Sequence, residues 1–435
     1  MTIPPTERPP LGEPAAATLR QYWLLLGGMV LVWLGCEAGA LAGWPAAPTW
    51  FALGHLARFP FFALGLGGPF FLHFGSRPGW SVAAATAALG LGLGALFYLL
   101  GPRVGLEVLP VNAPFAGLGA ASLAVLAGRA CVSRGRRRAG TLAVLLPACL
   151  LTGLTVLGVH FLRLSVVLCP TTDDGLLYAA DDALGGQLSF VVGRLFNAVP
   201  LLGLAAVLTY VSVAGAFVLL LILHQRADPS QRWTPLPVFV VASLVGYFVY
   251  LLFPAVGPEG VFGPAFPDSP PPVAAVLADP PAAGPQPRNC VPSLHLTWAL
   301  FLFWHARPLA AWFRAFAGAF LVLTLLATLG LGQHYAIDLV VAFPFALAMQ
   351  AAFAPAGPRP RLAAGALGLA LFAAWLLLLR FGLPLLAACP PLTGAAAVAT
   401  VAVSCLAEHR LYRLTAPHLP LDPGRSAATP STAPR

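Results

Sequence analysis

Residues 332–353 read GQHYAIDLVVAFPFALAMQAAF, with a histidine and an aspartate at the start of a long apolar run. A helix needs about 20 mostly apolar residues to cross a hydrocarbon core roughly 30 Å thick, so residues 335–353 are predicted to span a membrane. Ionisable side chains are costly inside such a segment and usually serve a function. The stretch therefore predicts a transmembrane helix with His334 and Asp338 at one end.

The rest of the chain is equally apolar. Of its 435 residues, 59% are hydrophobic and 9% are charged, whereas about 25% of residues are charged in soluble domains. The chain is therefore predicted to be an all-α, polytopic transmembrane helix bundle of about 12 spans. The expected spans are residues 22–43, 50–74, 80–101, 112–131, 141–168, 199–223, 236–254, 293–306, 312–332, 335–353, 362–381 and 384–406.

The basic residues predict how the bundle is oriented. All 24 are arginines, and the net charge of the chain is +9. Short cytoplasmic loops collect arginine, and placing both termini in the cytoplasm puts roughly 18 arginines inside and about four outside. This orientation predicts a multi-pass protein of a plasma or inner membrane, with residues 292–295 and 334–338 at the outer face. Arginines in short links are not a nucleic-acid footprint, so nucleic acid is not an expected partner, and no protein partner is indicated.

The spacing of the spans divides the chain into four regions. Residues 1–140 form an N-terminal four-span bundle with a cytoplasmic lead, and residues 141–354 form a six-span core that contains both histidine motifs. Residues 355–406 add two spans. Residues 407–435 are rich in Pro, Ala and Thr and are expected to be a disordered cytoplasmic tail.

Two connections inside the core are unusual. Residues 171–198 hold paired acids followed by an apolar stretch, which predicts a helix lying at the outer interface. Residues 254–288 are dense in Pro and Gly, so we expect an irregular but stiff loop. A loop of this length inside a compact domain usually has a function.

The sequence Pro292-Ser293-Leu294-His295 precedes another apolar run and looks like the start of a helix. Pro suits the first turn of a helix, and Ser293 is a favourable N-cap. The free N–H groups at such an end attract phosphate oxygens. His295 is positioned to act as a general acid, and Arg288 could clamp phosphoryl oxygens.

His334 and Asp338 are four residues apart, so on a helix they share one face. A hydrogen bond from one imidazole nitrogen to the carboxylate would fix the tautomer and make the other nitrogen more nucleophilic.

The simpler alternatives are a structural hydrogen bond between helices for the pair of His334 and Asp338, a plain N-cap for Ser293, and an arginine at the headgroup level for Arg288. Arg58 and Arg163 are further candidates because they fall within predicted spans.

The seven cysteines are scattered, without the close pairs of a zinc or redox site. They indicate no metal, and no cofactor is expected. Cys169, Cys290 and Cys389 are predicted near the outer face, where an oxidising compartment could join two of them.

The segment Pro292-Ser293-Leu294-His295, followed by Gly332-Gln333-His334-Tyr335-Ala336-Ile337-Asp338, resembles the second and third motifs of the type 2 phosphatidic acid phosphatase superfamily. Upstream, Tyr250-Leu251-Leu252-Phe253-Pro254 and Gly257-Pro258 are similar to its inositol phosphorylceramide synthase-like branch, whose members are inositolphosphotransferases. The resemblance covers residues 141–354. It implies that His295 is the proton donor, that His334 forms a phosphohistidine, and that Asp338 orients His334.

The chain also departs from the phosphatase pattern. It has no lysine, although the first motif of that pattern begins with one, and Thr328 stands where the third motif carries an arginine. Leu294 replaces the usual Gly of the second motif, as in the synthase-like branch. Phosphoryl groups need cationic partners, so Arg288 is the hypothetical replacement for the missing clamps.

These features predict an integral membrane phosphatase or phosphotransferase that acts on a lipid phosphate or phosphodiester at the outer face through a phosphohistidine. Water as the acceptor gives a phosphatase, and an alcohol gives a phosphotransferase; the sequence leaves both open. The main alternative is a transporter or lipid-handling protein in which the His and Asp groups bind a ligand or protons. A third interpretation, a scaffold without activity, has only the missing basic residues in its favour.

Overall fold

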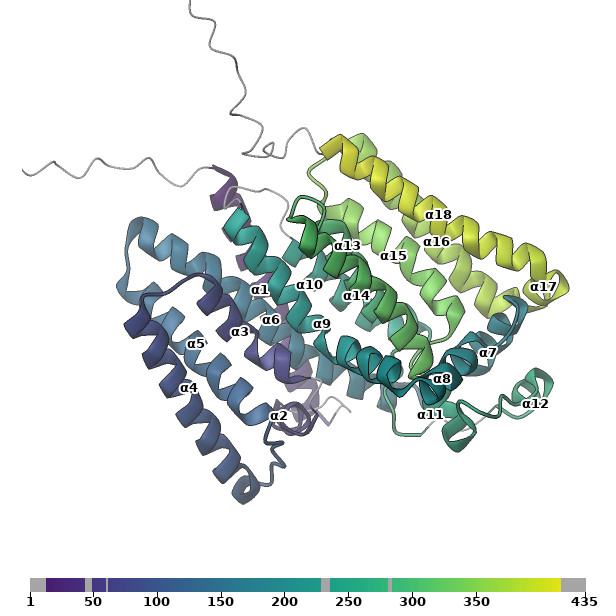
Figure 1. The fold of residues 1–435 in the computed structure, drawn as a ribbon, viewed down its shortest axis with the longest axis horizontal. Coiled ribbons are helices and arrows are strands. Elements are labelled where there is room, and N and C mark those ends of the chain that lie inside the picture. The colour runs from purple at the N-terminus through teal and green to yellow at the C-terminus, as the bar shows by residue number, and fades with distance from the viewer. Residues whose placement is uncertain (1–12, 44–48, 60–61, 228–234, 281–283, 416–435) are drawn as a thin grey trace, which may run out of the picture.

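The structure is a computed structural model that describes residues 13–43, 49–59, 62–227, 235–280 and 284–415. Within these ranges the regular structure is entirely helical, which confirms the predicted all-α class (Figure 1). Ten of the described helices are long and apolar enough to cross a membrane. They are α1 (Glu13–Leu41), α4 (Trp80–Leu100), α5 (Asn112–Val132), α6 (Gly135–Leu168), α9 (Pro200–Ala227), α10 (Pro235–Leu252), α14 (Ala311–Gly330), α15 (Ala336–Phe353), α16 (Pro358–Phe381) and α18 (Pro390–Thr415).

Two predicted spans differ from the structure. The span expected at residues 50–74 consists of two helices, α2 (Thr49–Arg58) and α3 (Ala63–Gly75). The span expected at residues 293–306 is α13 (Leu294–His305), whose 12 residues extend only about 18 Å at 1.5 Å per residue. That length is shorter than the roughly 30 Å hydrocarbon core. A hydropathy pattern does not show such interruptions, because it averages over a window.

The two unusual connections inside the predicted core are also more divided than expected. Residues 171–198 form α7 (Asp174–Ala183) and α8 (Leu188–Ala198) instead of one helix. Gly185 and Gly186 separate these helices with φ angles of 115° and 125°, which only glycine adopts readily. The predicted irregular loop contains short helices: α11 (Pro258–Phe262), η3 (Gly263–Ala265) and α12 (Val273–Ala278). The remaining short elements are η2 (Gly101–Val104) and α17 (Leu383–Ala388).

The chain ends differ from the expected lead and tail. Helix α1 begins at Glu13, inside the predicted lead, and α18 continues to Thr415, so residues 407–415 are helical and not part of a disordered tail. The rest of the predicted tail, residues 416–435, and the first 12 residues lie outside the described ranges.

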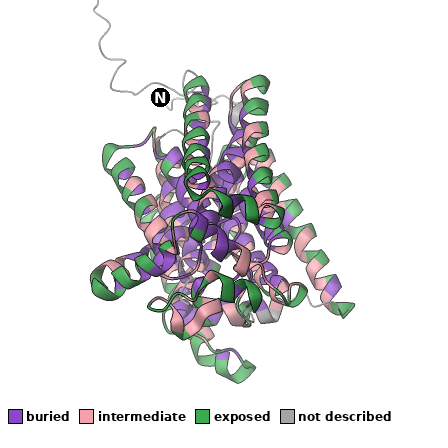
Figure 2. Cartoon of the chain, turned by 90° about the vertical axis from the view of Figure 1, so that its right-hand side faces the viewer, coloured by how far each residue is buried: buried purple, intermediate pink, exposed green. Residues whose placement is uncertain are grey.

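The helices form three neighbouring groups. Helices α2–α5 lie on one side, α16–α18 lie on the other, and α9, α10 and α13–α15 lie between them (Figure 1). Helix α6 contacts α1, α3, α5 and α10, so it joins the N-terminal group to the central one. Buried residues concentrate in the middle of the molecule, and the outlying helices present exposed apolar faces (Figure 2). The central group therefore provides the interior in which a polar site can be enclosed.

The two histidine motifs lie at the same end of the helices. The motif loops meet where Ser293 Oγ approaches His334 Nε2, at 3.2 Å. The same end receives the C-terminus of α6, because Arg288 Nε donates to the carbonyl of Cys169 at 3.0 Å. Since α6 starts beside the arginines within residues 134–138, this cluster lies at the opposite end of that helix.

Candidate active site

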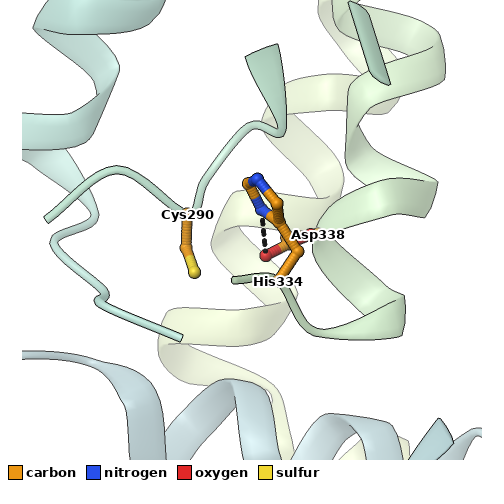
Figure 3. Close-up of side chains that lie close together, drawn as sticks. All are labelled: Cys290, His334 and Asp338. Carbon is orange, nitrogen blue, oxygen red and sulfur yellow. Dashed lines mark hydrogen bonds and ion pairs between the residues drawn. The ribbon is translucent and has the colours of Figure 1, made fainter. Parts of the chain in front are cut away.

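The turn before α15 holds the third motif. His334 lies just outside the helix, which begins at Ala336 with Tyr335 as N-cap. The prediction that His334 and Asp338 share a helix face is therefore wrong in detail, but the two side chains still meet. His334 Nδ1 lies 3.2 Å from Asp338 Oδ2, to which it donates (Figure 3). The same oxygen accepts from the Tyr335 N–H at 3.1 Å. Asp338 thus belongs to a capping box that also binds the imidazole.

Ser293 connects the second motif to the third. It is the N-cap of α13, and its Oγ accepts from the Leu296 N–H at 3.3 Å. The same Oγ lies 3.2 Å from His334 Nε2. A neutral imidazole that donates from Nδ1 to Asp338 presents its Nε2 lone pair to Ser293. The predicted N-cap is confirmed, and the same Ser293 side chain lies beside Nε2 of His334.

His295 lies in the first turn of α13 and is 7% exposed. Its ring stacks on Tyr210 of α9, with centroids 3.9 Å apart and planes 18° apart. The ring centroids of His295 and His334 are 6.3 Å apart. This separation allows one tetrahedral phosphoryl group to touch both imidazoles. No pattern in the sequence pointed to Tyr210, because an aromatic residue within a span is ordinarily a packing residue.

Two carboxylates of α7 hold the motif loops in place. Asp181 accepts from the N–H groups of Ala336 and Ile337, both at 2.8 Å, and so binds the first turn of α15. Asp174 accepts from the N–H groups of Val256 and Gly257 at 2.9 to 3.1 Å. Both side chains are almost completely buried. They were expected only as charges of the outer surface.

Burial sets the ionisation of these two acids. Burial, with a smaller contribution from the nearby Asp338, raises the pKa of Asp181 to about 8, against the lowering effect of the two N–H donors. Burial also raises the pKa of Asp174, while its hydrogen bonds, including one from the Tyr335 hydroxyl at 3.0 Å, lower it. Asp174 and Asp181 are seven residues apart, the spacing of one helix face. This spacing in the sequence could have indicated that both side chains point from one face of the helix into the protein.

Cys290 is a further neighbour of the site. Ligand atoms of Cys290, His334 and Asp338 lie within 4.8 Å of one another, close enough to be considered as a metal site (Figure 3). Burial, followed by the charges of Asp338 and Asp174, raises the pKa of the Cys290 thiol well above its usual value. Its Sγ donates to the Gln333 carbonyl at 3.1 Å. The thiol thus has a backbone hydrogen-bond acceptor beside the two motif residues.

Arg288 is buried, 2% exposed, and binds backbone carbonyls. Its Nε donates to Cys169 at 3.0 Å, and its Nη1 donates to Gly284 at 2.9 Å and to Gln286. Burial lowers the pKa of its guanidinium, and the charge of Asp174 opposes this effect. These contacts brace the loop before the second motif, and the predicted role of Arg288 as a phosphate clamp stays a prediction.

The other singled-out arginines lie in different surroundings. Arg58, at the end of α2, forms a solvent-exposed ion pair with Glu107 at 2.8 Å. Arg163 of α6 lines a cavity that also contains His295. Within the described residues, all seven cysteines, including Cys169 and Cys389, are free thiols.

Thr328 occupies the position where the phosphatase pattern has an arginine. Its carbonyl accepts from the N–H groups of Gln333 and His334, both at 3.1 Å, and its hydroxyl donates to the Thr324 carbonyl at 2.9 Å. The residue therefore shapes the turn that presents His334, and the cation of the pattern has no substitute at this position.

The fold and the site together define a helical integral membrane protein with a buried His–Ser–His–Asp arrangement at one end of its central helices. Residues 176–352 match the family model described as PAP2 superfamily. The matched segment runs from α7 to α15 and contains all four of these residues. This part of the chain is therefore similar to the PAP2 superfamily. The chain has no match among the curated proteins or the solved structures.

Proposed function

We propose that the protein is a membrane lipid phosphate phosphatase or phosphotransferase that works through a phosphohistidine on His334. The observation that carries the proposal is the polarity of the His334 ring. Asp338 binds Nδ1, and Nε2 faces Ser293 and the ring of His295. An imidazole oriented in this way is an activated nucleophile beside a second group that can move a proton.

In the first step, the lone pair of His334 Nε2 attacks phosphorus, and the bond from phosphorus to the lipid oxygen breaks. His295, protonated beside the phosphate anion, gives its proton to the leaving oxygen, so the lipid alcohol departs neutral. Asp338 stabilises the positive charge that develops on the His334 ring.

In the second step, His295 takes a proton from the acceptor hydroxyl, whose oxygen attacks the phosphorus. The nitrogen–phosphorus bond breaks, and His334 is restored. Water as acceptor releases inorganic phosphate, whereas an alcohol, such as an inositol or lipid hydroxyl, yields a new phosphodiester when the transferred group carries an ester. The similarity of residues 250–258 to the inositolphosphotransferase branch supports testing alcohols as well as water.

The arginine distribution supports an outer location for this chemistry. The cluster at residues 134–138 lies at the start of α6, and the motif loops meet the other end of that helix. Arginine-rich ends face the cytoplasm in most membrane proteins. A lipid phosphate of the outer leaflet would then reach the site through its headgroup.

The test is turnover by the purified, detergent-solubilised protein on a panel of lipid phosphates and phosphodiesters, with and without alcohol acceptors. We expect His334→Ala to reduce turnover by about 10⁴-fold or more, as losses of nucleophiles do. The matched control is His409→Ala, which removes an exposed histidine of α18. Acid-labile phosphate bound to the wild type and absent from His334→Ala would identify the intermediate.

Turnover that survives in His334→Ala would contradict the mechanism. Ligand uptake without release of phosphate or formation of a phosphodiester, in a well-folded wild type, would instead support the transporter alternative.

A further inference from the structure

A cavity of about 610 Å³ extends from His295 into the apolar interior. Its volume falls in the range of about 300 to 1,000 Å³ that is common for small-molecule sites. Most of the lining side chains are aliphatic or aromatic, among them Leu154, Val213 and Phe239. The cavity therefore joins the candidate catalytic site to a space suited to hydrocarbon.

The N-terminal helices form one wall of this cavity. Helix α2 contributes His55, the connection to α3 contributes Phe59 and Phe62, and α3 contributes Gly65. Helices α9 and α10 of the matched segment also line the cavity. Residues 49–75 precede the segment that matches the family model, so this wall lies outside the matched segment.

The lining of the cavity along α6 is longer than one leaflet of the hydrocarbon core is thick. Its lining residues on α6 run from Leu151 to Val166, which corresponds to about 22 Å along a helix axis at 1.5 Å per residue. Half of a hydrocarbon core roughly 30 Å thick is about 15 Å. A long hydrocarbon chain would fit along this path with its polar end beside the motifs.

Polar groups gather where the cavity meets the motif loops. Arg163, Asn289, His295 and Gln333 are among the lining residues. Arg163 is two residues from Ser165, whose Oγ accepts from the Arg288 N–H at 3.0 Å, so this end of α6 contacts the loop that leads to the second motif. Arg163 is exposed, and it places a positive charge on the lining of a cavity that also includes the candidate proton donor His295.

We propose that this cavity binds the lipid phosphate substrate, with its hydrocarbon chain between α3, α6 and α9 and its anionic headgroup beside Arg163. The inference rests on the proposed function and adds the place where the hydrocarbon chain and the headgroup of the substrate bind. It also gives the N-terminal helices a direct part in substrate binding. The chain has Thr328 where the phosphatase pattern has an arginine, and it lacks the lysine of the first motif. Arg163 then supplies a cation for the phosphoryl group in their place.

The first test narrows the apolar part. Ala214 lines the cavity from α9, and Ala214→Trp fills space in it. We expect the ratio of KM for a long-chain phosphate ester to KM for a short-chain one to rise by about 10-fold or more, since each buried methylene contributes about 0.8 kcal/mol. The control is Val207→Trp, on the same helix but 41% exposed and outside the lining. An unchanged ratio in Ala214→Trp would overturn the placement of the chain.

The second test concerns the headgroup. We expect Arg163→Gln to lower kcat/KM by roughly 10- to 100-fold for phosphate esters of every chain length, because a charged hydrogen bond contributes about 1.5–3 kcal/mol. Arg194→Gln, which alters an exposed arginine of α8, is the matched control. A loss confined to long-chain substrates, or no loss, would contradict a headgroup role for Arg163.

A third measurement does not depend on turnover. A long-chain lipid phosphate with a photoreactive group at the end of its chain is crosslinked to the wild type, and the labelled peptides are identified by mass spectrometry. We expect labelling of the cavity segments of α3, α6 and α9, and its loss in Ala214→Trp but not in Val207→Trp. Labelling only of exposed lipid-facing residues would overturn the inference, whereas cavity labelling without turnover would contradict the proposed function alone.

Discussion

Helices α1 and α15 have the same mean hydropathy but opposite surroundings. In α15, 78% of the most apolar window is buried inside the protein, whereas the corresponding share in α1 is 11%. Helix α15 packs against α16, α18, α13 and α10, and α1 makes its main contact with α6 alone. Hydropathy therefore predicts which segments enter a membrane but does not distinguish protein-facing from lipid-facing helices.

The polar groups of the two helices differ accordingly. Asp338 in the first turn of α15 is fully buried and binds His334, whose Nε2 faces Ser293. Glu37 of α1 is partly exposed and accepts from the Thr49 N–H at 2.7 Å. A buried carboxylate interacts more strongly with a neighbouring charge or hydrogen-bond donor than an exposed one, because water does not screen the interaction. If burial, and not composition, makes the central helices sensitive to substitution, changes there should lower stability and turnover more than changes in the outlying helices.

The largest effect is expected at Asp181, which holds the first turn of α15. Asp181→Ala leaves the buried N–H groups of Ala336 and Ile337 without their acceptor, at a cost of about 1–3 kcal/mol each. We expect lower thermal stability in detergent and a loss of the proposed turnover. The neighbouring exposed residue provides the control, Asp182→Ala, and equal behaviour of the two variants would contradict the positioning role of Asp181.

The next effect concerns how closely α15 approaches α16. A Cβ at Gly368 would lie 2.7 Å from the backbone N of Ala348 and 2.7 Å from the backbone O of Pro344. We expect Gly368→Leu to destabilise the protein by about 1–3 kcal/mol or more through overpacking. A Cβ at Gly92 of α4 would meet no atom within 4 Å, so Gly92→Leu should be tolerated. Thermal unfolding of both variants in detergent measures the difference, and a similar loss in both would remove the distinction between the regions.

The third prediction is a pH dependence of stability. The pKa of Asp181 is about 8 in the folded protein and about 3.9 in an unfolded chain, so folding favours its protonated form. The contribution is fully present below a pH of about 4 and is lost as the pH rises through about 8. We expect the unfolding temperature of the wild type to fall over this range and to fall less in Asp181→Asn. An identical slope in the two proteins would show that folding does not raise the pKa of Asp181.

The smallest effect is expected at the ion pair between Arg58 and Glu107. Its side chains are 57% and 76% exposed, and exposed pairs contribute about 0–1 kcal/mol. Glu107→Gln should therefore leave the unfolding temperature and the turnover nearly unchanged. A marked loss in either measurement would indicate that the N-terminal helices are more tightly coupled to the site than their exposure suggests.

Much of the architecture and part of the site followed from the sequence by itself. Long apolar runs predict helices because a membrane offers no other partner for backbone N–H and C=O groups. The arginine-rich links predict which helix ends lie together, and the spacing of Ser293, His295, His334 and Asp338 indicated a shared site. These properties are local, so they can be recognised without knowing how the helices pack.

The tertiary structure decided what encloses that site. Asp174 and Asp181 were expected at the surface, yet they are buried under the motif loops, and Cys290 and Tyr210 lie beside the histidines. The N-terminal helices, which carry no recognisable motif, form a wall of the cavity at His295. Contacts between residues far apart in the chain depend on which apolar face meets which neighbour, and helices of equal hydropathy have no local property that determines this choice.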